Sequence, residues 1–212
     1  EDGMIIPTTS VGNSPVIAQH AKEIIIELNI AQPAELEGIH DIYVPGPQGK
    51  REAIPMLHAG ERIGTPGIQV DVSKIRGIVL SEIKDAPSLI VPPDEETAQI
   101  AAHLLTFFRQ EIEAGRLTNE LAPLQSGVGS VANAVLNGFL HSEFENLEVY
   151  SEVLQDAVFE LIDAGKVKVA SGTSITLSEA YGKEVYGNLK KYQQQLVLRP
   201  QEISNHPEII RR

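Results

Sequence analysis

The stretch LEVYSEVLQDAVFELIDAGKVKVA, residues 147–170, decides the fold class of this chain. Residues 147–150 have the apolar character of a strand, and residues 167–170 predict another. Between them, apolar residues at helical spacing predict a helix that Gly165 ends: Val153, Leu154, Ala157, Val158, Leu161 and Ile162. A strand, a helix and a second strand in this order are typical of an α/β fold with a largely parallel sheet.

Two further helices are expected before this stretch. Asp94 follows two prolines and precedes two glutamates, so a helix should begin there with its acidic first turn at the positive end of the helix dipole. Its apolar stripe should end at Gly115. Residues 124–129, LQSGVG, predict a strand that runs into a tight glycine turn, and residues 131–136 predict the second helix. Ligand sites in such sheets collect where strands end and helices begin.

The chain divides at two consecutive prolines near residue 92. Before them, residues 75–83 predict a strand, and the β-branched run at 24–28 predicts a buried one. Ser14 is expected to cap a short helix whose first position is a proline. Residues 31–67 are rich in proline and glycine and too long for an idle connector in a compact domain. This region should carry function or hold short strands, such as one at 42–44.

Composition excludes several classes of function. The 212 residues carry a formal net charge of −12, so the net basic face that nucleic-acid binding needs is not expected. The chain has no cysteine, which excludes thiolate nucleophiles, disulfides and cysteine zinc sites. No apolar run approaches the ~18 residues of a membrane span. The six histidines form no i,i+4 pair, so no histidine metal site is expected.

Three familiar motifs are also excluded. The segment GPQGKR, residues 46–51, lacks the first glycine and the final Ser or Thr of a phosphate loop. The segment SGVG, residues 126–129, lacks the third glycine of a dinucleotide fingerprint. No G-x-S-x-G nucleophile elbow occurs in the sequence.

Two strand–helix junctions remain as candidate sites. The glycines at 127–129 let a ligand approach the backbone, and amides at the following helix start can act as an oxyanion hole. The same glycines also suit an ordinary tight turn. Glu152 is expected where a strand gives way to a helix, where the helix N-terminus would keep the carboxylate charged for nucleophilic attack. An acid there also stabilises a helix without any chemistry.

Several long motifs together resemble one family, the acetyl-CoA hydrolase/CoA-transferase family, and within it the succinyl-CoA:acetate CoA-transferases. These motifs occur in the order PTTSVGNS (7–14), LEGIHDIY (36–43), LQSGVGSVANAVL (124–136), FENLEVYSEVLQD (144–156) and LRPQEISNHPEIIRR (198–212). The resemblance implies CoA-transferase-type, NagB/RpiA-like domains with largely parallel sheets. Family members are more than twice this length and have two such domains, with the active site between them.

The resemblance also implies where this chain lies in such a protein. Residues 1–91 would be the C-terminal part of the first domain, and residues 92–212 the N-terminal part of the second, which carries the catalytic glutamate. The chain is therefore expected to be a central piece of a longer protein. A second oxyanion donor of the family, a glycine, would lie beyond Arg212.

Carried over by position, the family's catalytic glutamate matches Glu152. Its oxyanion-hole amide matches Val128, and Gly129 belongs to the same oxyanion and substrate-binding turn. Gly127 is expected to contact CoA. The family's asparagine near the substrate carboxylate matches Asn205, although an asparagine at this position also suits a turn or a helix cap.

The implied reaction transfers CoA between an acyl-CoA, such as succinyl-CoA or acetyl-CoA, and a carboxylate such as acetate. It passes through a covalent glutamyl-CoA thioester, and acetyl-CoA hydrolysis results when water replaces the acceptor. CoA would be part of the substrate, with no permanently bound cofactor and no metal. The expected partners are acyl-CoA and small carboxylates, without nucleic acid or membrane, in a homodimer. The expected location is cytoplasmic, or mitochondrial for a fungal source.

Two other interpretations stay open. The chain could be a CoA-binding piece that lacks the residues for turnover. It could also be an unrelated α/β domain that binds sugar phosphates or nucleotides, in which case Glu152 would have no chemistry.

Overall fold

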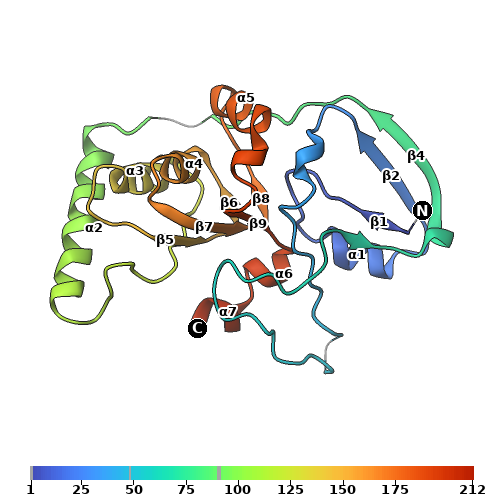
Figure 1. The fold of residues 1–212 in the computed structure, drawn as a ribbon, viewed down its shortest axis with the longest axis horizontal. Helices are drawn as coiled ribbons and strands as arrows, with labels where there is room; N and C mark the ends of the chain where they lie inside the picture. Colours follow the sequence, from blue (N-terminus) through green and yellow to red (C-terminus); the bar gives the residue numbers. More distant parts are fainter. Residues whose placement is uncertain (1, 48, 90–91) are drawn as a thin grey trace.

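A parallel sheet forms the centre of the computed structural model, which describes residues 2–47, 49–89 and 92–212 (Figure 1). The strand order is β5 (Leu147–Tyr150), β7 (Val167–Gly172) and β9 (Leu196–Leu198). Both neighbouring pairs are parallel. The α/β fold class with largely parallel pairing that the sequence predicts is therefore confirmed.

Helices cover both sides of this sheet (Figure 1). On one side, α4 (Asp156–Asp163) packs on β7, α3 (Ser130–Phe139) packs on α4, and α2 (Glu95–Glu113) packs on α3. On the other side lie two short helices, α6 (Gln201–Ser204) and α7 (Pro207–Arg211). The layers therefore leave the ends of β5 and β9 close to the short helices.

Distant segments extend the central sheet at both edges. Beside β5, the amide of Leu124 donates to the carbonyl of Glu148 at 2.8 Å. Beside β9, the amide of Leu198 donates to the carbonyl of Ile39 at 2.7 Å, and the amide of Asp41 donates to the carbonyl of Leu198 at 2.9 Å. The region before residue 92 thus contributes directly to the sheet of the region after it.

The other strands of the described residues form three two-stranded sheets. Strands β6 (Val153–Leu154) and β8 (Ser174–Ile175) pair in parallel, and Ser10 forms an antiparallel bridge to Ser174. Strand β1 (Met4–Ile5) is antiparallel to β3 (Ile68–Gln69). The third sheet is the parallel pair of β2 (Ile24–Asn29) and β4 (Ile75–Ser81). The remaining elements are α1 (Ser14–His20), α5 (Glu179–Gly187) and the 3₁₀ turns η1 (Ala34–Leu36), η2 (Val72–Lys74) and η3 (Leu189–Lys191).

The helix expected from Asp94 is confirmed with its cap. The Asp94 side chain accepts from the Thr97 amide, and the Thr97 hydroxyl accepts in return from the Asp94 amide, so both groups of a capping box are present. At the other end, Gly115 has a φ of 71°, which favours glycine over other residues.

The helix expected over residues 153–162 begins later than predicted. Val153 and Leu154 form β6, and α4 begins only at Asp156. The backbone of Leu154 pairs with β8, and its side chain is fully buried in the core. A short apolar run fits a strand or a helix equally well by periodicity, so only the distant partner at β8 decides between them.

The strand expected at 24–28 exists, but the prediction that it is buried is wrong. Ile25 of β2 is 71% exposed and Leu28 is 51% exposed, while Leu80 of the partner strand β4 is 69% exposed. Parallel strands are normally covered on both faces. Among the described residues, no element covers these side chains.

Three smaller expectations also need correction. Helix α1 begins at Ser14 itself, and Asn13 takes the N-cap position without a side-chain hydrogen bond. Of the strand expected at 124–126, only Leu124 forms a bridge. Of the strand expected at 42–44, only Ile42 forms a bridge, with Thr65. Gln48 of the GPQGKR segment, and residues 90–91 at the expected division of the chain, lie outside the described residues.

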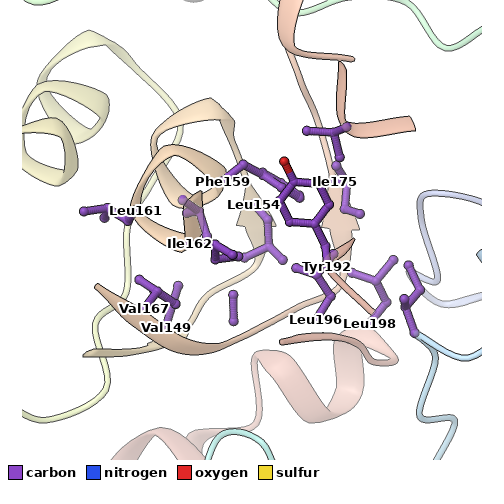
Figure 2. Close-up of a cluster of buried hydrophobic side chains, with 14 of the residues drawn as sticks. Val149, Leu154, Phe159, Leu161, Ile162, Val167, Ile175, Tyr192, Leu196 and Leu198 are labelled. Atoms are coloured by element: carbon purple, nitrogen blue, oxygen red, sulfur yellow. The ribbon is translucent and has the colours of Figure 1, made fainter. Parts of the chain in front are cut away.

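One hydrophobic core joins the two regions of the chain. Its centre, between the central sheet, β6, β8 and α4, contains Val149, Leu154, Phe159, Leu161, Ile162, Val167, Ile175, Tyr192, Leu196 and Leu198 (Figure 2). The rings of Phe159 and Tyr192 meet edge to face with their centroids 5.4 Å apart. Val11, Leu36 and Ile39 from the first region belong to the same core.

A buried ion pair fixes the first region to the end of β9. The side chains of Arg199 and Asp41 form a salt bridge and are 0% and 1% exposed. Arg199 also donates to the hydroxyl of Ser171 at 2.8 Å and to the carbonyl of Ala59 at 3.0 Å. Burial lowers the pKa of Arg199 and the charge of Asp41 opposes that effect. Because each charge depends on the other, neither can be removed alone without cost.

The first prediction concerns this pair. Replacing Arg199 with Met leaves the Asp41 carboxylate buried without its cation, so we expect the free energy of unfolding to fall by about 3–5 kcal/mol. Denaturant titration of the complete gene product measures it. The matched control is Arg76→Met, which breaks an exposed pair with Glu23 and should change stability little. Equal losses for the two variants would contradict the structural role of the buried pair.

Candidate active site

A cavity of about 730 Å³ lies beside β5 and the two short helices α6 and α7. It contains Glu152 and Asn205, two of the residues that the sequence proposes for the site. The further lining side chains include Gln125, Glu148 and Tyr150. Another cavity, of about 800 Å³, lies between residues 31–33, 84–87 and α5 and contains none of the proposed site residues.

Glu152 lies in the bend between β5 and β6, with its side chain exposed. Its carbonyl accepts hydrogen bonds from the amides of Thr173 at 2.8 Å and Ser174 at 3.2 Å. Its Oε1 accepts a hydrogen bond from Nε2 of Gln201 at 2.9 Å. The backbone of Glu152 is thus held by Thr173 and by Ser174, the first residue of β8, and its carboxylate is held by Gln201 of α6.

The expected reason for the position of Glu152 is wrong. Since α4 begins at Asp156, Glu152 does not lie at a helix N-terminus, and the acid in the first turn of α4 is Asp156. The side-chain amide of Gln201 takes the place of the helix dipole as the group that stabilises the Glu152 carboxylate.

The glycine turn lies next to this bend but does not line the cavity. The hydroxyl of Ser151 donates to the carbonyl of Ser126 at 2.8 Å, which ties the turn to the residue before Glu152. Gly129 is the N-cap of α3 with a φ of 141°, and no side chain caps this helix. The Val128 side chain is 68% exposed. Gly127, Val128 and Gly129 are not among the residues that line the cavity.

Asn205 shares the cavity with Glu152. It is exposed at the C-cap of α6, and its amide donates to the carbonyl of Gln201 at 3.0 Å. The next residue, His206, caps the start of α7 with its side chain. Asn205 therefore ends α6 at a cap position that suits an asparagine, and it also lines the cavity.

Sequence reasoning missed two residues that support the site. Gln201 holds Glu152, and the hydroxyl of Tyr150 donates to the carbonyl of Ile203 at 2.5 Å. Burial raises the pKa of Tyr150 to about 12, so this phenol keeps its proton at neutral pH. A signal for Gln201 was available, because it lies four residues before Asn205 in the motif LRPQEISNHPEIIRR and thus one helical turn away.

The proline- and glycine-rich region also reaches this site. Met56, His58 and Ala59 line the cavity. Nη1 of Arg212 donates to the carbonyls of Ile54 and Met56, both at 3.0 Å, and so holds the loop against α7. Within residues 2–47, 49–89 and 92–212, no group of three or more His, Asp or Glu side chains could hold a metal ion. No helix of the same residues is long and apolar enough to cross a membrane.

Comparison with known proteins supports the resemblance seen in the motifs. Residues 1–80 match the family model described as acetyl-CoA hydrolase/transferase N-terminal domain. The whole chain is 46% identical to an acetyl-CoA hydrolase of Schizosaccharomyces pombe and 44% identical to a succinyl-CoA:acetate CoA-transferase of Clostridium kluyveri. The resemblance to the acetyl-CoA hydrolase/transferase family is therefore confirmed. The chain spans 40% and 39% of the length of these two relatives.

Solved structures show the same fold. RipA from Yersinia pestis superposes with a TM-score of 0.66 at 19% identity, covering 98% of this chain and 40% of that one. The 4-hydroxybutyrate CoA-transferase from Porphyromonas gingivalis superposes with a TM-score of 0.61 at 18% identity, covering 99% of this chain and 44% of that one. Nearly the whole chain therefore has the fold of matching parts of RipA and of this 4-hydroxybutyrate CoA-transferase.

The second prediction concerns the glycine turn. Gly129 has a φ of 141°, which other residues rarely adopt, so Gly129→Ala should destabilise the start of α3 by about 1–3 kcal/mol. An added Cβ meets no atom within 4 Å at Gly129 or at Gly127, so crowding does not contribute. Gly127 has no positive φ, so Gly127→Ala is the matched control and should be tolerated. Hydrogen exchange of the Asn133 amide, which donates to the Gly129 carbonyl at 3.0 Å, measures the difference, and equal protection in both variants would contradict the strained turn.

Proposed function

We propose that this chain forms part of an acyl-CoA:carboxylate CoA-transferase in which Glu152 is the nucleophile. The observation that carries this proposal is that Glu152 and Asn205 share one cavity in a chain that is 41–46% identical to acetyl-CoA hydrolases and a CoA-transferase. The proposed substrates are succinyl-CoA or acetyl-CoA with acetate. Hydrolysis of acetyl-CoA is the second activity of the same site.

The proposed reaction proceeds by covalent catalysis. A carboxylate oxygen of Glu152 attacks the thioester carbonyl of the acyl-CoA, and the C–S bond breaks to release CoA as a thiolate. The thiolate then attacks the glutamyl carbonyl of the resulting mixed anhydride. This step releases the first carboxylate and leaves a glutamyl-CoA thioester. An acceptor carboxylate reverses the sequence and leaves as the new acyl-CoA.

Nearby groups would support these steps. The amide of Val128 is the proposed donor to the developing oxyanion, with Gly129 in the same turn and Gly127 beside CoA. Loss of one such donor typically costs about 10²–10³ in rate. The amide of Asn205 is the proposed partner of the acceptor carboxylate. The bond between Ser151 and Ser126 supports this arrangement because it holds the turn beside the nucleophile.

Access of water would decide between transfer and hydrolysis. The anhydride and the glutamyl thioester both react with water, so transfer requires that water be excluded while they exist. The Glu152 side chain is exposed among the described residues. In the proposed enzyme, bound substrate or a part of the protein outside this chain must therefore cover it during transfer.

The proposed division into two domains rests on the exposed sheet. We propose that residues 1–91 complete a first CoA-transferase-like domain and residues 92–212 begin a second one, with residues 39–41 of the first pairing with β9 of the second. An isolated parallel pair with apolar side chains exposed on it, as in β2 and β4, is unusual for a complete domain. We further propose a homodimer for the complete protein and a cytoplasmic location, or a mitochondrial one for a fungal source.

The third prediction tests the nucleophile. In the complete gene product, Glu152→Ala should lower kcat for transfer and for hydrolysis by about 10⁴-fold or more, because the covalent intermediate forms on the carboxylate that this substitution removes. Glu179→Gln is the matched control, since Glu179 is an exposed acid on α5 outside this cavity, and should turn over like the wild type. Full turnover by Glu152→Ala would reject the proposed function.

A further inference from the structure

Gln201 is the residue that holds the carboxylate of Glu152, and it is itself held by the first region of the chain. Its Nε2 donates to Oε1 of Glu152 at 2.9 Å. Among the hydrogen bonds of the described residues, none involves Oε2 of Glu152. One oxygen of the carboxylate is therefore fixed by an amide, and the other stays available for attack.

A closed chain of hydrogen bonds sets the positions of both residues. The amide of Thr173 donates to the carbonyl of Glu152 at 2.8 Å, and the amide of Val11 donates to the carbonyl of Thr173 at 2.9 Å. The amide of Gly12 donates to Oγ1 of Thr173 at 3.1 Å. The amide of Gln201 donates to the carbonyl of Gly12 at 3.0 Å. The path returns to Glu152 through the Gln201 side chain.

A second contact fixes the helix that carries Gln201. The buried hydroxyl of Tyr150 donates to the carbonyl of Ile203 at 2.5 Å. Tyr150 ends β5 two residues before Glu152, and Ile203 follows Gln201 by two residues on α6. The contacts through Thr173 and Gly12 and the bond from Tyr150 to Ile203 thus fix the backbones of Glu152 and Gln201 relative to each other, so the fold sets their separation.

We propose that Gln201 is a positioning residue for the nucleophile, which it holds through Oε1 in every state of the reaction. This inference rests on the proposed function. In the free enzyme the amide restricts the Glu152 rotamer and leaves Oε2 to attack the acyl carbonyl, which favours a near-attack geometry.

The same amide has a second task once the glutamyl-CoA thioester has formed. Oε1 is then the carbonyl oxygen of the thioester. When the acceptor carboxylate attacks this carbon, a C–O bond forms and negative charge develops on Oε1. The C–S bond then breaks, and the electron pair leaves with the CoA thiolate. An amide N–H already directed at Oε1 stabilises that charge without any rearrangement.

Two substitutions test this proposal in the complete gene product. Gln201→Ala removes the donor, and we expect kcat to fall about 10–100-fold while KM for the acyl-CoA changes less than about twofold. Gln201→Glu keeps the size of the side chain but places a second carboxylate beside Glu152. While the introduced carboxyl is ionised it repels Glu152 and offers no hydrogen to Oε1, so activity should be low at neutral pH. As the pH falls, protonation of the introduced carboxyl restores a donor, and activity should recover.

The matched control is Gln193→Ala. The Gln193 amide also donates two hydrogen bonds, to the carbonyls of Glu35 at 2.8 Å and Glu37 at 3.0 Å, but neither bond involves Glu152. Its kcat and pH profile should match the wild type. Melting temperatures of all variants separate loss of folding from loss of rate, and the Gln201→Glu pH profile decides the matter if Gln201→Ala does not fold.

The outcomes distinguish this proposal from the proposed function. Wild-type kcat and pH profile in both Gln201 variants, with an inactive Glu152→Ala, would overturn the role of Gln201 and leave Glu152 as the nucleophile. Full activity in Glu152→Ala would instead overturn the proposed function itself. A loss of kcat in Gln193→Ala equal to that in Gln201→Ala would also overturn the proposal, because any lost glutamine contact would then have the same effect.

Discussion

The buried ion pair between Asp41 and Arg199 is the constraint on which the arrangement of this chain depends. Two opposite charges without access to solvent are stable only together, so residues 158 positions apart in the sequence are held at one point. At that point residues 39–41 pair with β9, and the chain continues from Arg199 directly into α6. The pair thus sets where α6 begins, and through α6 it sets where Gln201 and Asn205 lie relative to Glu152.

This dependence explains why the motifs are spread over the whole chain. The VGNS segment supplies Gly12, which bonds both Thr173 and Gln201. The LEGIHDIY segment supplies Asp41, and the last motif supplies both Arg199 and Gln201. Only Glu152 and Asn205 of the proposed residues line the cavity. Much of the sequence resemblance therefore lies in residues that build the site.

Local sequence patterns correctly predicted the elements that are determined by interactions between nearby residues. The Asp94 cap, the helix that Gly115 ends and the parallel strands of 147–170 follow from neighbours within a few residues. The strand at Val153–Leu154 and the exposure of Ile25 depend on partners elsewhere in the fold. Periodicity alone therefore predicted a helix at 153–154 and a buried strand at Ile25, and both predictions were wrong. Glu152 was identified as a candidate, but the local reason given for it was a helix N-terminus, and α4 begins only at Asp156. The actual partner of Glu152, Gln201, lies 49 residues away, and the only sequence signal for Gln201 is its place one helical turn before Asn205.

The central claim is that the carboxyl group of Glu152 becomes bonded to CoA. The most direct measurement is the mass of the peptide that contains residue 152 after the complete gene product reacts with acetyl-CoA and then with borohydride. Borohydride reduces a glutamyl thioester to an alcohol, so the account predicts that this peptide alone changes mass, and only when acetyl-CoA was added. An unchanged peptide from enzyme that turns over in the same sample would contradict it.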